Sequence, residues 1–279
     1  MKLEAVDYTA ENAKQLFVES LRNTGFGVLK NHPIQQKLVQ NIYDNWYKFF
    51  NSVEKSDFHF NVETQDGFFP SEVSETAKGH TQKDIKEYFH YYPWGQCPTE
   101  LKQEIQQYYQ EANELATELL AWVEEYSPNA ISAKYSQSLS SMIDGSNKTL
   151  LRVLHYPPLD GDEQLGAIRA GAHEDINLLT ILPAANEPGL QVLAKDGTWM
   201  DVPCDFGNLI INIGDMLQEA SDGYFPSTTH RVINPEGADK AKSRISLPLF
   251  LHPKPDVVLS EKYTAHSYLM ERLRELGLI

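Results

Sequence analysis

Residues 172–182 read Ala-His-Glu-Asp-Ile-Asn-Leu-Leu-Thr-Ile-Leu, a largely apolar stretch with one histidine and two acids near its start. The apolar run predicts a buried β-strand. Successive side chains of a strand point to opposite faces, so we expect His173 and Asp175 on one face and Glu174 on the other. An imidazole and a carboxylate placed in this way can take two adjacent positions on one metal ion.

A third metal ligand is expected from His230, which lies in another strand-like run, Thr229-His230-Arg231-Val232. Two histidines and one carboxylate leave three positions open, as in non-haem Fe(II) oxygenases. Taken alone, His173 is more often a structural histidine. A zinc protease would carry His-Glu-x-x-His on a helix. No second histidine follows Glu174 one turn later, so the helical zinc site is excluded.

A candidate anion site follows the candidate metal ligands. Arg244 and Ser246 begin an apolar run and, by strand alternation, share one face. A guanidinium binds a carboxylate through two parallel hydrogen bonds, and a hydroxyl two residues further on can add a third. Tyr156 could supply another hydroxyl. Such a pocket suits the remote carboxylate of 2-oxoglutarate, although an isolated Arg-x-Ser pair is more often exposed.

The region from residue 150 to residue 252 predicts a series of short strands separated by turn signals such as Lys195-Asp196-Gly197. Strands at this spacing favour a β-sandwich or jelly roll over a parallel sheet. The expected strands cover residues 151–156, 172–182, 190–194, 198–202, 208–213, 230–233 and 244–251.

The remainder of the chain is mainly helical by its hydrophobic periodicity. Residues 63–96 show weak periodicity and are expected to form a long ordered loop, with 66–94 as a candidate lid over the substrate. A short strand is expected at residues 26–30. The expected helices cover residues 11–22, 34–50, 100–126, 130–142 and 265–276.

The charge of the chain limits the classes of ligand that it is expected to bind. Its 39 acidic residues outnumber its 24 basic ones, giving a formal net charge of −15. Such a balance argues against a nucleic-acid substrate, which needs clustered Lys and Arg, and favours a small molecule. We find no secretory signal and no apolar stretch that could span a bilayer, so we expect no membrane partner. With only two cysteines, far apart in sequence, the cytoplasm is the expected compartment.

Together these motifs resemble the isopenicillin N synthase-like branch of the 2-oxoglutarate/Fe(II)-dependent dioxygenases. The resemblance covers nearly the whole chain and rests on stretches that follow in the family's order: Gly25–His32, His173-Glu174-Asp175, Gly189–Val192, Gly197–Trp199, Asn212–Leu217, His230-Arg231-Val232 and Arg244-Ile245-Ser246. One departure is visible, because Leu154 stands where the family often has Asn two residues before the tyrosine. The Asn212-Ile213-Gly214-Asp215 stretch is expected to be structural, a strand that ends in a glycine turn.

The resemblance implies an α+β fold with a mainly β core: a double-stranded β-helix, or jelly roll, with a helical N-terminal region and a C-terminal helix. It implies Fe(II) on His173, Asp175 and His230, with the co-substrates 2-oxoglutarate and O₂. The keto acid is expected on Tyr156, Arg244 and Ser246. We expect three parts in one compact unit: a mostly helical region at 1–148, the dioxygenase core at 149–254 and a terminal helix at 255–279.

The expected reaction is oxidation of a C–H bond in a small molecule, most often hydroxylation, while 2-oxoglutarate is decarboxylated to succinate. Asn177 and Phe250 are candidate substrate contacts, because even spacing places them on the faces of Asp175 and Ser246. Two alternatives stay open. One is an isopenicillin N synthase-type oxidase without 2-oxoglutarate, disfavoured because residues 273–279 contain no glutamine. The other is an inactive binding protein, which need not keep all three ligands.

Overall fold

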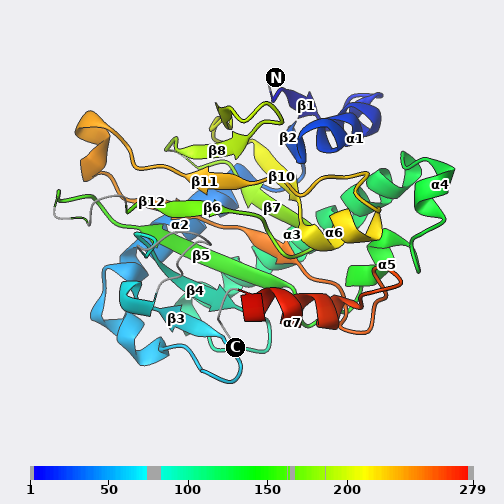
Figure 1. Ribbon diagram of the computed structural model, residues 1–279. Helices are drawn as coiled ribbons and strands as arrows, with labels where there is room; N and C mark the ends of the chain where they lie inside the picture. The colour runs from blue at the N-terminus through cyan, green and yellow to red at the C-terminus, as the bar shows by residue number, and fades with distance from the viewer. Residues whose placement is uncertain (1–2, 74–82, 162, 164–166, 186, 276–279) are drawn as a thin grey trace.

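The computed structural model describes residues 3–73, 83–161, 163, 167–185 and 187–275. Its strands form two facing sheets (Figure 1). The larger sheet contains β1 (Ala5–Asp7), β2 (Phe26–Lys30), β3 (Gly67–Phe69), β4 (Glu87–Tyr91), β5 (Leu150–Tyr156), β7 (Leu179–Pro183), β10 (Leu209–Ile213), β12 (Arg244–Ser246) and β13 (Leu249–Leu251). The smaller sheet contains β6 (Ala170–His173), β8 (Leu190–Leu193), β9 (Trp199–Asp201) and β11 (His230–Val232).

The order of strands brings distant parts of the chain together. The larger sheet runs β1-β2-β10-β7-β13-β5-β4-β3, with β12 also paired to β5, and the smaller runs β6-β11-β8-β9. Strands β6, β11 and β8 lie side by side in Figure 1. The pairings in the core are antiparallel, apart from β1 with β2. The expected α+β jelly roll is therefore confirmed.

Helices cover one face of the larger sheet. The described helices are α1 (Ala13–Thr24), α2 (Gln36–Phe50), α3 (Thr99–Glu125), α4 (Asn129–Ser132), α5 (Leu139–Ile143), α6 (Asp215–Ala220) and α7 (Ala265–Glu275), with short 3-10 segments at Val53–Phe58, Ser71–Val73 and Gly237–Ala241. All of these α-helices except α4 contribute residues to the core on this face. A large apolar cluster fills the space between these helices and the sheet. Within the described residues, no helix is both long enough and apolar enough to cross a membrane.

A second apolar cluster lies between the two sheets, and alternation along β5 separates the two clusters. Leu151 and Val153 pack into the cluster on the helical side. Leu154 and Tyr156 point the other way, into the cluster shared with residues of β6, β8 and β11. Polar residues on this second face of β5 and its neighbours therefore point into the space between the sheets, where the candidate site residues were expected.

Several expected elements differ from those observed. The predicted strand at 172–182 is wrong as one element, because the chain leaves the smaller sheet after His173 and enters the larger one at Leu179. The predicted strand at 244–251 divides into β12 and β13, and the helix at 130–142 divides into α4 and α5. The predicted loop at 63–96 contains the short strands β3 and β4, so part of it belongs to the sheet. Residues 74–82 of the candidate lid lie outside the described residues.

A buried polar network joins β4 to β5. Glu87 and His155 are direct partners in the register, and Glu87 Oε1 lies 2.7 Å from His155 Nδ1. The other carboxylate oxygen accepts a hydrogen bond of 2.9 Å from Lys55 Nζ. The far side of the imidazole reaches Ser243 Oγ at 2.5 Å, next to β12. Burial acts to raise the pKa of Glu87, but the hydrogen bonds from His155 and Lys55 outweigh it and lower the pKa below its ordinary value.

We predict that Glu87→Gln destabilises the protein by about 1–3 kcal/mol near pH 7, because a charge-assisted buried network is lost. A carboxyl with a lowered folded-state pKa stabilises the protein above its ordinary pKa of 4.5 and loses that effect as pH falls through the folded value. The difference in unfolding free energy between wild type and variant should therefore shrink below about pH 4.5. Urea denaturation at several pH values measures it.

The matched control for this prediction is Glu54→Gln, since Glu54 is exposed. It should change the unfolding free energy by less than about 0.5 kcal/mol at every pH. A Glu87→Gln deficit of the same size at pH 3.5 and pH 7 would contradict the proposed contribution of this carboxylate.

Candidate metal centre

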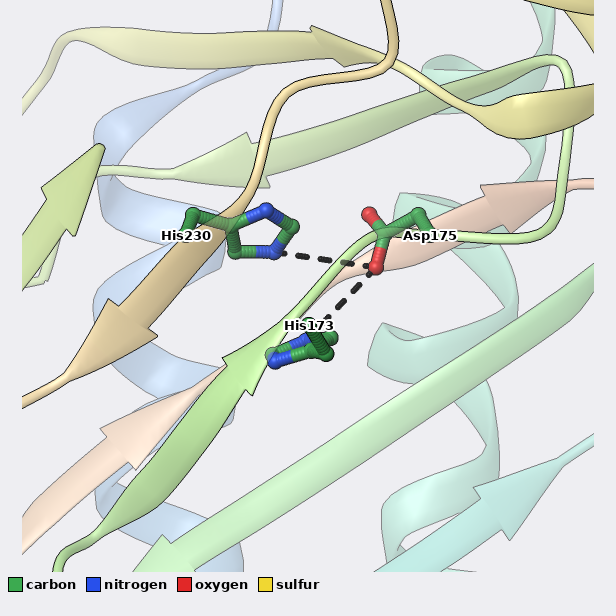
Figure 2. Close-up of side chains that lie close together, drawn as sticks. All are labelled: His173, Asp175 and His230. Carbon is green, nitrogen blue, oxygen red and sulfur yellow. Dashed lines mark ion pairs between the residues drawn. The ribbon is translucent and has the colours of Figure 1, made fainter. Parts of the chain in front are cut away.

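The three candidate metal ligands converge on one point (Figure 2). One ligand atom from each of His173, Asp175 and His230 lies within 4.8 Å of the others. Asp175 Oδ1 is 3.8 Å from His173 Nε2 and 3.7 Å from His230 Nε2. The two histidines are direct partners in the pairing of β6 with β11, and their ring centroids are 4.4 Å apart. Among the described residues, these three side chains form the group whose ligand atoms are close enough together to hold a metal ion.

Asp175 reaches this point by a route that the sequence did not predict. It lies beyond the end of β6, where the chain crosses between the sheets, so its position does not come from alternation along one strand. It is 6% exposed, and its Oδ2 accepts hydrogen bonds from Thr180 Oγ1 at 2.5 Å and Asn212 Nδ2 at 2.8 Å. Oδ1 is therefore left to face the two imidazoles.

The environment keeps the Asp175 carboxyl ionised. Burial acts to raise its pKa, and the imidazoles of His230 and His173 oppose that effect in their protonated forms. The two hydrogen-bond donors lower the pKa further, so the net direction is below the ordinary value. An ionised carboxylate fixed on one oxygen, with the other directed at two ring nitrogens, has the charge that a divalent cation requires.

Both imidazoles are oriented through their Nδ1 atoms. His173 Nδ1 lies 2.8 Å from the Gly171 carbonyl oxygen, and His230 Nδ1 lies 3.1 Å from that of Thr228. A carbonyl only accepts, so Nδ1 carries a proton, and Nε2 is the nitrogen available to a metal at the common point. Burial, and then the charge of His230, lower the pKa of His173, although 42% of its side-chain surface is still accessible. A neutral ring is the form that binds metal.

The 212–215 stretch forms the predicted strand that ends in a glycine turn. It ends β10 and begins α6, as a strand followed by a turn. Its first residue, Asn212, also hydrogen-bonds the candidate metal ligand. A Cβ on Gly214 would lie 2.1 Å from the Asn177 carbonyl oxygen, so glycine is needed for the turn at Asn177 to pack here. The Asp215 amide then donates to the Asp175 carbonyl oxygen at 2.7 Å.

The three residues predicted to bind an anion lie together between the sheets. Arg244 pairs with Tyr156 and Ser246 pairs with Leu154 across β12 and β5. Arg244, Ser246 and Tyr156 are all nearly inaccessible to solvent. The guanidinium carbon of Arg244 lies 5.2 Å from the Tyr156 ring centroid. Its Nε donates to the Glu187 carbonyl oxygen at 3.4 Å, and its buried Nη1 has no hydrogen-bond partner. A buried, unsatisfied guanidinium fits a carboxylate ligand.

The two predicted substrate contacts occupy different environments. Phe250 is half-buried and pairs with Thr180, the residue that hydrogen-bonds Asp175. Asn177 is fully buried, and its amide donates to the Leu179 carbonyl oxygen and to Thr180 Oγ1. Asn177 thus supports the residue behind Asp175. The substrate role stays a prediction for both residues.

Sequence reasoning missed three residues near the metal site. Thr180 and Asn212 act through the pairing of β7 with β10, a long-range register that no local pattern reveals. His252 lies one residue beyond β13, and its buried Nδ1 has no partner. Burial lowers the pKa of His252 to about 4, and the charge of Asp175 opposes that shift. Its even spacing from Ser246 and Phe250 could have suggested that its side chain shares their face.

Two family profiles match the chain. The 2OG-Fe(II) oxygenase superfamily matches residues 147–253, and the non-haem dioxygenase in morphine synthesis N-terminal family matches residues 3–118. All the residues discussed for the metal and anion sites fall within the first of these matches.

Individual proteins agree with the profiles. A crystal structure from Shewanella oneidensis, assigned as an oxygenase, is 68% identical over the whole of both chains, with a TM-score of 0.92. The 2-oxoglutarate-dependent dioxygenase 11 of Oryza sativa subsp. japonica is 31% identical over 88% of this chain and 71% of its own length. Gibberellin 2-beta-dioxygenase 2 of Arabidopsis thaliana is 33% identical over 57% of this chain, and the match spans only 45% of that enzyme.

We predict that Thr180→Val weakens Fe(II) binding about 10- to 100-fold, because Asp175 loses a hydrogen bond that orients it. Anaerobic titration with Fe(II) against a competing chelator measures the change.

The matched control is Thr149→Val. Thr149 is also fully buried, but its hydroxyl has no hydrogen-bond partner. This substitution should leave Fe(II) affinity unchanged. Equal affinities for wild type and Thr180→Val would show that the hydrogen bond to Asp175 does not matter for metal binding.

Proposed function

This chain belongs to the 2OG-Fe(II) oxygenase superfamily, and we propose that His173, Asp175 and His230 hold its Fe(II) ion. The observation that carries the proposal is the convergence of their three ligand atoms within 4.8 Å. Two neutral imidazoles and one carboxylate on one side of an ion leave the remaining positions for co-substrate and O₂. The carbonyl partners of the two Nδ1 atoms hold the rings in the ligating orientation.

We propose that Arg244, Ser246 and Tyr156 bind 2-oxoglutarate. The remote carboxylate would accept hydrogen bonds from the guanidinium and the Ser246 hydroxyl, and the Tyr156 hydroxyl is a further donor. The unpartnered Nη1 of Arg244 supports this role, since a buried N–H without an acceptor is costly unless a ligand supplies one. Leu154, where the family often has Asn, leaves this group of donors intact.

The reaction class follows from the cofactors. With Fe(II), 2-oxoglutarate and O₂ bound, the site supplies oxidation of a substrate C–H bond, most often hydroxylation, together with release of succinate and CO₂. The protein fixes geometry: Thr180 and Asn212 orient Asp175, while Phe250 lies on the strand beside Thr180. The apolar residues packed between the sheets exclude water from this space.

The competing functions are less well supported. The 31%-identical rice relative is named as a 2-oxoglutarate-dependent dioxygenase. This similarity disfavours an oxidase that works without 2-oxoglutarate. An inactive binding protein would have no reason to keep two oriented imidazoles and an ionised carboxylate at one point.

We propose a small-molecule substrate. The formal charge of −15 disfavours nucleic acid, and gibberellin, the compound in the name of the Arabidopsis relative, is a small molecule.

We propose the cytoplasm as the compartment, supported by two free cysteines.

We propose that the chain has three parts, residues 1–148, 149–254 and 255–279. The profile matches at 3–118 and 147–253 support this division. The first part also contributes β1 to β4 to the larger sheet.

We predict that anaerobic addition of Fe(II) and 2-oxoglutarate to the protein produces the weak visible charge-transfer band of a chelated keto acid. Arg244→Ala should weaken 2-oxoglutarate binding about 10- to 100-fold, because a charge-assisted hydrogen bond contributes about 1.5–3 kcal/mol. Titration of the band with 2-oxoglutarate gives the dissociation constant.

Arg22→Ala serves as the control, because Arg22 is exposed on α1. Its titration curve should match that of wild type. Absence of the band in wild type would reject 2-oxoglutarate as the co-substrate, and an unchanged curve for Arg244→Ala would reject the assigned anion site.

A further inference from the structure

A second buried arginine lies beside Arg244. Arg169 immediately precedes β6 in the smaller sheet, is 1% exposed, and is among the largest fully buried side chains. Its guanidinium carbon lies 5.9 Å from the Tyr156 ring centroid, and that of Arg244 lies 5.2 Å from the same ring. The two sheets thus each direct one guanidinium to a single phenol ring in the space between them.

Arg169 is anchored, but part of its hydrogen-bonding capacity is unused. Its Nη2 donates to the Lys242 carbonyl oxygen at 2.8 Å, and its backbone N–H donates to Asn234 Oδ1 at 2.9 Å. Its buried Nε has no hydrogen-bond partner. Arg244 shows the same combination of one carbonyl contact and one unsatisfied buried nitrogen. The two guanidiniums are therefore held in place with donors left over.

The pair also lacks a counter-ion within the described residues. Neither Arg169 nor Arg244 forms an ion pair there, and the carboxylate that influences Arg169, that of Glu187, lies 3.4 Å from Lys242 Nζ. Burial, and then the charge of Arg244, lower the pKa of Arg169. Two like charges taken out of water without an anion are costly unless a ligand supplies the opposite charge.

We propose that Arg169 is a second arginine of the co-substrate site, and that Arg169 and Arg244 together bind the carboxylate of 2-oxoglutarate remote from the metal. This inference rests on the proposed function. A carboxylate has about four lone-pair sites, enough to accept from two guanidiniums as well as from Ser246. The consequence is specificity: two arginines reject a keto acid whose far end carries no charge, because both would stay buried without an acceptor.

The test compares two keto acids that differ only at the far end, 2-oxoglutarate and 2-oxovalerate, in which a methyl group replaces the remote carboxylate. Their affinities for the anaerobic Fe(II)-protein are measured by the charge-transfer band or by calorimetry. Arg169→Met should weaken 2-oxoglutarate binding about 10- to 100-fold while leaving 2-oxovalerate binding within about twofold. Arg244→Met should show the same dependence on the ligand.

Arg169→Lys is the second variant, since it keeps the charge and lacks the planar fork. We expect it to fold as wild type and to lose about three- to tenfold in 2-oxoglutarate affinity alone, which tests the inference even if Arg169→Met fails to fold. Equal losses with both keto acids would show that Arg169 is only structural, and no loss with either would exclude contact with the ligand. In both cases wild type still binds 2-oxoglutarate. Failure of wild type to bind it would instead overturn the proposed function.

Discussion

The ionised carboxylate of Asp175 is the group on which the rest of the site depends. It must be buried to meet two imidazoles and must also stay charged, and these requirements oppose each other because burial raises its pKa. The two imidazoles, which attract the carboxylate when they are protonated, and the hydrogen bonds from Asn212 and Thr180 resolve the conflict. Those donors come from β7 and β10 of the larger sheet, whereas the imidazoles belong to the smaller one. The proposed metal site can therefore form only when the two sheets face each other correctly.

The same arrangement explains why the interior of the jelly roll is partly polar. Apolar residues from both sheets pack at its centre, yet Arg169, Arg244 and Tyr156 share that space. Arg169 immediately precedes β6 of the smaller sheet and Arg244 begins β12 of the larger one, so the proposed anion site, like the proposed metal site, would be built across the gap. Buried positive charge and candidate metal ligands that share the space between the sheets suit a dicarboxylic keto acid, whose two ends differ in role. Both proposed sites therefore depend on the spacing between the two sheets.

The spacing of short strands, which is a local property, and the family resemblance together predicted the jelly roll, and the order of the motifs in that resemblance pointed to the candidate metal ligands. Alternation along one strand was expected to place Asp175 on the face of His173, but the chain leaves that strand after His173. The roles of Thr180, Asn212 and Arg169 could not be predicted, because they depend on the register of β7 with β10 and on which residues meet across the sheets. The region 63–96 was expected to be a loop because β3 and β4 are short and carry few aliphatic residues.

The most direct measurement is an anaerobic crystal structure of the protein with Mn(II), as an inert substitute for Fe(II), and 2-oxoglutarate. The account predicts one ion bound to His173, Asp175 and His230. It also predicts the keto acid chelating that ion, with its remote carboxylate within hydrogen-bonding distance of Arg244. An ion held elsewhere, or a keto acid whose far carboxylate points away from this arginine toward solvent, would contradict it.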